Sequence, residues 1–152
     1  MRRLAIALAT VGGVGRAPVA SGTVGSLVAL PLLPLLAALR DRAPLAWTAC
    51  LVGIVAAAVW SAGTAEDALG GADHPTIVVD EVAGMVVAGA FLPPTWLAAC
   101  VAFVLFRLFD VVKPYPANVF DGRIEGGVGV VGDDLVAGAY AGLVTWMVLR
   151  WA

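Results

Sequence analysis

The chain has 152 residues, of which 61% are hydrophobic and 13% charged, and its mean hydropathy is +0.97. A soluble domain of this size needs more polar side chains to cover its surface, so the composition predicts an integral membrane protein with a single domain over residues 1–152. The net charge of −2, without any basic stripe, excludes the electrostatic footprint of a nucleic-acid-binding protein.

Charge-free runs of the sequence predict membrane-spanning helices, because a span needs roughly 20 apolar residues. Pro31 and Pro34 predict a kink or tilt in the first of these runs. Trp146 and Trp151 end the last run and suit a position at the membrane interface. Three of the predicted helices cover residues 23–39, 45–63 and 135–151.

A further apolar run, residues 82–106, is long enough for one crossing but contains Pro93 and Pro94 near its middle. Two adjacent prolines usually end a helix. One interpretation is a single kinked span. The other, which we favour, is a hairpin of two short helices that turns at residues 92–95. The hairpin places the three polar segments of the chain at one membrane face, namely residues 16–26, 64–81 and 107–134.

The distribution of cations then predicts the orientation. Most of the Lys and Arg residues belong to the face with the polar segments, and cytoplasmic loops carry an excess of Lys and Arg. The sequence therefore predicts an all-α integral membrane protein with about four to five hydrophobic helices and a polar active-site face at the cytoplasmic boundary. The cations of that face are Arg2, Arg3, Arg16, Arg107, Lys113 and Arg123, against Arg40, Arg42 and Arg150 on the other.

The first polar segment combines glycines with hydroxyl side chains at a predicted helix start. Gly22 and Gly25 permit unusual backbone angles, and Thr23 and Ser26 add hydroxyls where a helix N-terminus would attract phosphate. The alternative is a helix cap with glycines for turning. The segment lacks the Gly-Lys-Ser/Thr sequence of a nucleotide P-loop.

The second polar segment ends in two adjacent acids, Asp80 and Glu81, immediately before an apolar helix. One acid is enough to cap a helix, so a pair suggests a second purpose. Carboxylates at a membrane boundary suit a hard cation such as Mg²⁺, which prefers oxygen ligands. His74 is the single histidine of the chain, and its place before Pro75 in a loop favours a structural role over a catalytic one.

The third polar segment places Arg107, Asp110 and Lys113 three residues apart, so that neighbours in the series lie close together on a helix. One interpretation is a self-neutralising cluster of charges. The other is an acid for metal binding or catalysis beside two cations that bind phosphate, a task for which Arg is well suited. A membrane-type chain rarely keeps so many charges together without a function for them.

A glycine-rich stretch follows at residues 126–132 and formally matches GxGxxG. No βαβ unit surrounds it, so we exclude a dinucleotide-binding fold and predict a loop that brings backbone close to a ligand. Asp133 and Asp134 are predicted to open the last helix as a second acidic pair. Two acidic pairs, Asp110 and nearby cations together indicate a metal-dependent phosphoryl site.

These residues resemble the phosphatidylglycerophosphatase A family, a family of bacterial lipid phosphatases. The resemblance implies an all-helical enzyme of the bacterial cytoplasmic (inner) membrane, active in phospholipid biosynthesis. It also implies Mg²⁺-dependent hydrolysis of a phospholipid substrate, phosphatidylglycerophosphate, to phosphatidylglycerol and inorganic phosphate. The motifs that carry it are SGTVGSL at 21–27, DHPTIVVDEVAGM at 73–85, FRLFDVVKPYPA at 106–117 and GGVGVVGDDLVAG at 126–138.

The resemblance also assigns site residues. Asp110 is either a further metal ligand or the base for an attacking water, and a covalent aspartyl-phosphate route stays open. The sequence leaves the oligomeric state open as well. The predicted metal ligands are Asp80, Glu81, Asp133 and Asp134, which with Asp110 form the catalytic set; the predicted phosphate-binding residues are Thr23, Ser26, Arg107 and Lys113.

Other function classes fit the sequence less well. A lipid-headgroup phosphotransferase also uses clustered Asp and Mg²⁺, but its Asp-Gly…Ala-Arg…Gly…Asp…Asp pattern is not found. In a transporter the carboxylates would line a path through the bilayer. Here they are predicted at helix ends and in loops, which favours a site at the membrane interface.

Overall fold

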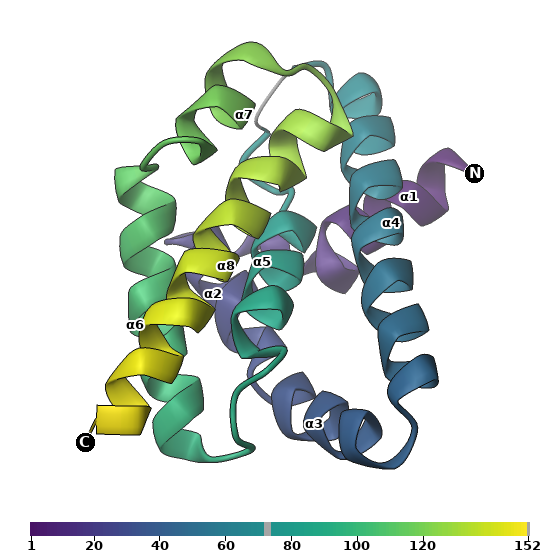
Figure 1. Ribbon diagram of the computed structural model, residues 1–152. Helices are drawn as coiled ribbons and strands as arrows, with labels where there is room; N and C mark the ends of the chain where they lie inside the picture. Colours follow the sequence, from purple (N-terminus) through teal and green to yellow (C-terminus); the bar gives the residue numbers. More distant parts are fainter. Residues whose placement is uncertain (72–73, 152) are drawn as a thin grey trace.

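The computed structural model describes residues 1–71 and 74–151, and the protein is 81% helical with no strand in that described part. The predicted all-α class is therefore confirmed. Figure 1 shows the helices in chain order. They are α1 (Arg2–Ala9), the 3₁₀ segment η1 (Val11–Arg16), α2 (Ser21–Ala29), α3 (Leu32–Arg42), α4 (Pro44–Leu69), α5 (Val79–Gly89), α6 (Trp96–Val112), α7 (Ala117–Arg123) and α8 (Gly127–Trp151).

Among the described residues, three segments are long and apolar enough to cross a membrane. The first consists of α2 and α3 with a bend at Leu30 and Pro31, which is the kink that the prolines predicted. Pro31 has no backbone N–H and cannot continue the hydrogen-bond ladder of α2. The three segments are Ser21–Arg42, Pro44–Leu69 and Gly127–Trp151.

The apolar run at residues 82–106 forms the predicted hairpin. Its helices α5 and α6 have 11 and 17 residues, or about 16 and 25 Å, each shorter than the roughly 30 Å of a bilayer core. Thr95 begins α6 by accepting a hydrogen bond from the N–H of Ala98 at 3.2 Å. Arg40, at the end of α3, donates to the carbonyl oxygens of Ala90 at 3.1 Å and Leu92 at 3.3 Å. An arginine of the second, less polar face thus holds the hairpin turn.

Small residues let α8 pack closely against α5 and α6. Figure 1 shows α8 running across α5 and beside α6. A Cβ at Gly138 would lie 2.2 Å from the carbonyl oxygen of Gly84. A Cβ at Gly84 would lie 2.6 Å from the ring of Phe106, which is fully buried. Close backbone approach at small residues is typical of helices that associate in membranes. This contact holds the acidic start of α5 against the acidic part of α8.

The glycine-rich stretch is helical from Gly127 onward, so the predicted loop at residues 126–132 is wrong except at Gly126, which has a φ of 71° before α8 begins. A Cβ at Gly127 would lie 1.9 Å from the carbonyl oxygen of Val59, and one at Gly132 would lie 2.2 Å from the ring of Phe120. The glycines therefore let α8 begin in contact with α4 and α7, and this packing outweighs the low helix propensity of glycine. Asp133 and Asp134 consequently lie about two turns inside α8 rather than at its start.

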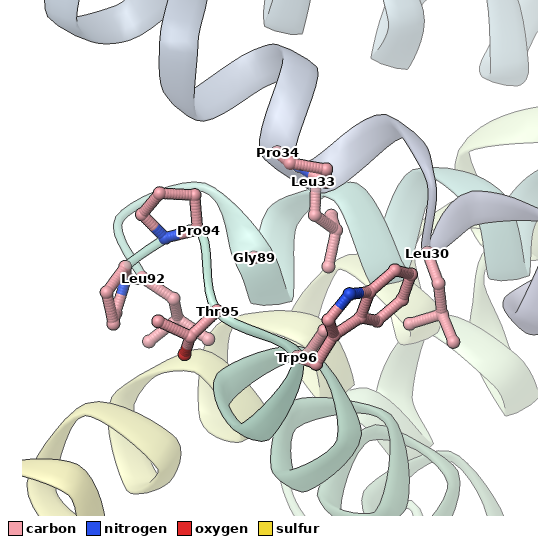
Figure 2. Close-up of a pocket in the computed structure, with 10 residues that line it drawn as sticks. Leu30, Leu33, Pro34, Gly89, Leu92, Pro94, Thr95 and Trp96 are labelled. Carbon is pink, nitrogen blue, oxygen red and sulfur yellow. The ribbon is translucent and has the colours of Figure 1, made fainter.

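A small apolar cavity of about 90 Å³ lies between the α2–α3 bend and the hairpin turn. Figure 2 shows the ring of Trp96 on one side of it and Leu33 on another. Among the residues that the structure describes, no charged side chain lines this cavity. The charged chemistry of the chain is therefore found elsewhere in the fold.

Candidate active site

A cleft of about 680 Å³ lies at the other end of the bundle from the hairpin turn. The end of α4, the start of α5, the end of α6, the helix α7 and the beginning of α8 surround it; α7 and the end of α4 are at the top of Figure 1, and the hairpin turn is at the bottom. Acidic side chains far outnumber basic ones in its described lining. They are Glu66, Asp67, Asp80, Glu81, Asp110, Asp121, Glu125, Asp133 and Asp134, against Lys113 and Arg123.

The deepest acidic residues form two overlapping groups. One group contains Asp80, Glu81 and Asp134, and the other contains Asp110, Asp133 and Asp134. In each group, one oxygen from every carboxylate lies within 4.8 Å of those of the other two. The structure thus brings together all five acids that the sequence singled out, and Asp134 belongs to both groups.

Several of these oxygens are buried without a partner. Within the described part of the chain, no hydrogen bond reaches Oδ1 of Asp80, Oε2 of Glu81 or Oδ1 of Asp133. Asp134 is 3% exposed. Burying a carboxylate is costly unless a hydrogen bond, an opposite charge or a metal compensates. A set of buried oxygen donors with free lone pairs fits a hard divalent cation such as Mg²⁺.

The electrostatics of the α5 acids agree with that fit. Burial raises the pKa of Asp80 well above its ordinary value, and the adjacent charge of Glu81 raises it further. Burial also raises the pKa of Glu81. In both cases the negative form is destabilised, which is the condition that a bound cation relieves.

Arg107 is held from two sides. Its Nη1 lies 2.7 Å from Oδ2 of Asp110 and donates to Oγ of Ser26 at 3.5 Å. Ser26 has no exposed surface, and its hydroxyl donates to the carbonyl oxygen of Gly22 at 2.9 Å. The geometry of Ser26 therefore fits support of Arg107 better than direct contact with phosphate. Thr23 is half-buried on α2 and is not part of the cleft lining.

Gly22 has a role that the sequence alone did not reveal. A Cβ at this position would lie 2.0 Å from Oε1 of Glu81 and 3.4 Å from Nη1 of Arg107. The start of α2 therefore packs directly against the carboxylate of Glu81. The sequence signal was the glycine itself, but its partner is 59 positions away and no local pattern connects them.

Lys113 joins α6, α7 and α8. It ends α6 in the left-handed conformation with a φ of 46°, which a residue other than glycine rarely adopts. Its Nζ lies 2.8 Å from Oδ2 of Asp133 and also pairs with Asp121. Burial alone would lower the pKa of the Lys113 ammonium, but its hydrogen bonds with Asp121 and Asp133 raise it above the ordinary value. The sequence prediction gave Asp121 no role, because its ion pair with Lys113 forms only when the turn between α6 and α7 brings the two side chains together.

His74 is structural in its contacts, in line with the sequence interpretation. Its Nδ1 lies 2.9 Å from the hydroxyl of Thr76, and it is not part of the cleft lining. Ser21 donates to the carbonyl oxygen of Pro75 at 2.8 Å, so this loop is tied to the start of α2. Asp73, the first residue of the motif at 73–85, lies outside the described residues.

Comparison with known proteins identifies the family. A model of the family "Phosphatidylglycerophosphatase A" matches residues 7–149. The chain is 37% identical over 143 residues to phosphatidylglycerophosphatase A of Escherichia coli (strain K12), covering 91% of this chain and 80% of that protein. It is 40% identical over 80 residues to phosphatidylglycerophosphatase A of Haemophilus influenzae, covering 52% of this chain and 49% of that protein.

A third relative carries a different name. A putative phosphatidylinositol-3-phosphatase of Bacteroides thetaiotaomicron is 35% identical over 154 residues, covering 97% of this chain and 94% of that protein. No solved structure matches the chain. The predicted resemblance is confirmed, and the chain belongs to the phosphatidylglycerophosphatase A family of phosphoric monoester hydrolases.

Proposed function

We propose that this chain hydrolyses the terminal phosphomonoester of phosphatidylglycerophosphate, releasing phosphatidylglycerol and inorganic phosphate in phospholipid biosynthesis. The observation that carries the proposal is the pair of overlapping carboxylate groups, with unpartnered buried oxygens, in a cleft at one end of a membrane-type helical bundle. The carboxylate oxygens of these groups suit a divalent cation, which in turn can bind phosphate. The family membership supports the same reaction.

The acidic lining makes a cation necessary for an anionic substrate. A phosphomonoester that enters a cleft with this excess of carboxylates is repelled unless positive charge compensates. We assign the metal ligands to Asp80, Glu81, Asp133 and Asp134, with Asp110 as either a further ligand or the base. A bound Mg²⁺ would supply Lewis-acid stabilisation of the negative charge on the phosphoryl group.

The chain's own cations add to this stabilisation. Lys113 lines the cleft and stays protonated, so its ammonium is available to a phosphate oxygen. Arg107 lies behind Asp110 and fixes that carboxylate at 2.7 Å. Ser26 and Gly22 keep Arg107 in place from α2. Thr23 remains a predicted phosphate-binding residue. Because it does not line the cleft, the phosphate group would have to extend beyond the cleft to contact it.

Asp110 is the residue we propose as base when it is not a metal ligand. Water attacks phosphorus, Asp110 takes a proton from that water, and the bond from phosphorus to the glycerol oxygen breaks. The leaving alkoxide is then protonated to give the lipid alcohol. In the alternative route a carboxylate attacks phosphorus first and water hydrolyses the aspartyl-phosphate. Trapping of a phosphorylated protein at acid pH distinguishes the two.

The fold suggests how a lipid reaches the cleft. With the apolar helices in the bilayer, the cleft lies at the polar end of the bundle. A lipid substrate can then leave its acyl chains in the bilayer while its headgroup enters the cleft. We propose the bacterial cytoplasmic membrane as the location and the cytoplasm as the side that the cleft faces, since the sequence predicts an excess of Lys and Arg on the face of the polar segments.

The test is phosphate release from lipid phosphomonoesters by the purified protein in detergent. We expect release from phosphatidylglycerophosphate with Mg²⁺, loss of release with EDTA, and loss in Asp80→Asn. Phosphatidylinositol-3-phosphate and phosphatidic acid are run beside it, because one relative is named for an inositol lipid. Faster hydrolysis of either would replace the proposed substrate, and no release from any lipid with any divalent cation would overturn the reaction.

A further inference from the structure

The two carboxylate groups of the cleft receive unequal positive charge from the chain itself. In the group of Asp110, Asp133 and Asp134, Arg107 lies 2.7 Å from Asp110 and Lys113 lies 2.8 Å from Asp133. In the other group, neither Asp80 nor Glu81 forms an ion pair with any described residue. Arg107 and Lys113 thus pair directly with the first group, whereas among the described residues Asp80 and Glu81 have no direct ion partner and only the more distant charge of Arg107 acts on Glu81.

We propose that the cleft holds two divalent cations of unequal affinity. A tight subsite consists of Asp80, Glu81 and Asp134, and a weak subsite consists of Asp110, Asp133 and Asp134. The inference rests on the proposed function for the kind of cation, and it goes further in the number of cations, the division of ligands and the order of binding.

Asp134 is the residue that couples the two subsites. It is the one acid common to both groups, it lines the cleft, and it is 3% exposed, so bulk water does not compensate its charge. Catalytic sites with two metals on shared carboxylates clamp the attacking and leaving oxygens of a phosphoryl group.

An unpartnered buried oxygen marks each subsite independently of the acidic clustering. Oδ1 of Asp80 and Oε2 of Glu81 mark the tight subsite. Oδ1 of Asp133 marks the weak subsite, and Asp133 is 7% exposed and lines the cleft. The other oxygen of Asp133, Oδ2, pairs with the ammonium of Lys113. Each group thus has a free ligand atom in the described structure. In the weak subsite, however, a cation must share the carboxylate of Asp133 with Lys113.

Lys113 makes the weak subsite depend on phosphate. Its ammonium repels an incoming divalent cation and at the same time attracts an anion. A phosphate ion that binds between them compensates both positive charges, so phosphate and the second cation strengthen each other's binding. Lys113 also pairs with Asp121, and both side chains line the cleft.

The experiment counts cations with Mn²⁺ as the probe. The full chain in detergent is stripped of metal with EDTA, the EDTA is removed, and Mn²⁺ is added while electron paramagnetic resonance reports the free ion. We expect two bound Mn²⁺ per chain, with dissociation constants at least about tenfold apart, the factor that a difference of ~1.4 kcal/mol gives. Binding of the second should broaden the signal of the first, because the two ions share a ligand. Inorganic phosphate should tighten the second ion alone.

Single substitutions divide the two subsites. Glu81→Gln should weaken the tight ion by about tenfold or more and Asp134→Asn should weaken both, whereas Lys113→Gln should tighten the weak ion by about tenfold. Asp67→Asn is the matched control, since Asp67 is an exposed acid of the same cleft that belongs to neither group. Circular dichroism and gel filtration verify that each variant is folded.

One bound Mn²⁺ per wild-type chain overturns the proposal, as do two equal ions or an unchanged or weaker second ion in Lys113→Gln. These readouts need no phosphatase activity. Two coupled ions in a protein that releases no phosphate would refute the proposed function and leave the two subsites standing. Phosphate release by a protein with a single bound ion would refute the two subsites and leave the proposed function standing.

Discussion

The backbone of Gly22, at the start of α2, lies directly against the carboxylate of Glu81, at the start of α5. A Cβ at position 22 would sit 2.0 Å from Oε1 of Glu81. Because Oε1 is the far end of a flexible side chain, Glu81 would move aside at little cost in stability. Its carboxylate would then no longer hold its place in the group with Asp80 and Asp134.

Gly22→Ala is therefore expected to lower turnover far more than stability. Displacement of a positioning group by about 1 Å can cost on the order of 10²-fold in rate. The measurement is phosphate release beside thermal unfolding of the same preparation. Gly53→Ala in α4 is the matched control, because a Cβ there meets nothing within 4 Å and alanine favours a helix. Wild-type turnover in Gly22→Ala would show that Glu81 has no part in the reaction.

Asp134→Asn should decrease turnover by about 10²–10³-fold, the range for removal of one preorganised electrostatic group. In EDTA the same variant should unfold at a higher temperature than the wild type, since a buried carboxylate near other carboxylates is replaced by a neutral amide. Asp41→Asn is the control, because Asp41 is exposed and pairs with Arg40 at the other end of the bundle. A lower unfolding temperature of Asp134→Asn in EDTA would contradict the predicted charge repulsion.

The sequence predicted those parts of the fold that depend on local chemistry. Pro31 produced a kink, and Pro93 and Pro94 produced a hairpin, because a missing N–H and a fixed φ act on the neighbouring residues alone. The grouping of the acids also followed, since residues at the polar ends of a hairpin and its neighbours converge on one face.

Contacts between distant segments could not be predicted in this way. Gly127 was expected in a loop, yet it is helical because α4 comes close enough that only glycine fits beside Val59. Two further contacts depend on how helices pack, which no local pattern in the chain encodes. They are the contact of Gly22 with Glu81 and the ion pair of Lys113 with Asp121 on α7.

Gly138→Ala tests the packing that joins the two acidic helices. The added Cβ would lie 2.2 Å from the backbone carbonyl oxygen of Gly84, which cannot rotate away. Overpacking of this kind costs about 1–3 kcal/mol, so we expect a lower unfolding temperature in detergent. Mn²⁺ affinity should fall as well, because α5 and α8 supply ligands to the same cleft. Gly122→Ala, where a Cβ meets nothing within 4 Å, should leave both quantities near wild type.

A crossing by α4 predicts opposite membrane faces for Asp41, at the end of α3, and Asp67, at the end of α4. Both side chains are exposed, so Asp41→Cys and Asp67→Cys, each in a Cys50→Ala/Cys100→Ala background, report the orientation. In spheroplasts a membrane-impermeant maleimide should label Asp41→Cys at once and Asp67→Cys only after the membrane is broken, since the end with more Lys and Arg faces the cytoplasm. Labelling of Asp67→Cys in intact spheroplasts would invert the orientation and place the acidic cleft outside. Equal labelling of the two would mean that α4 does not cross the membrane.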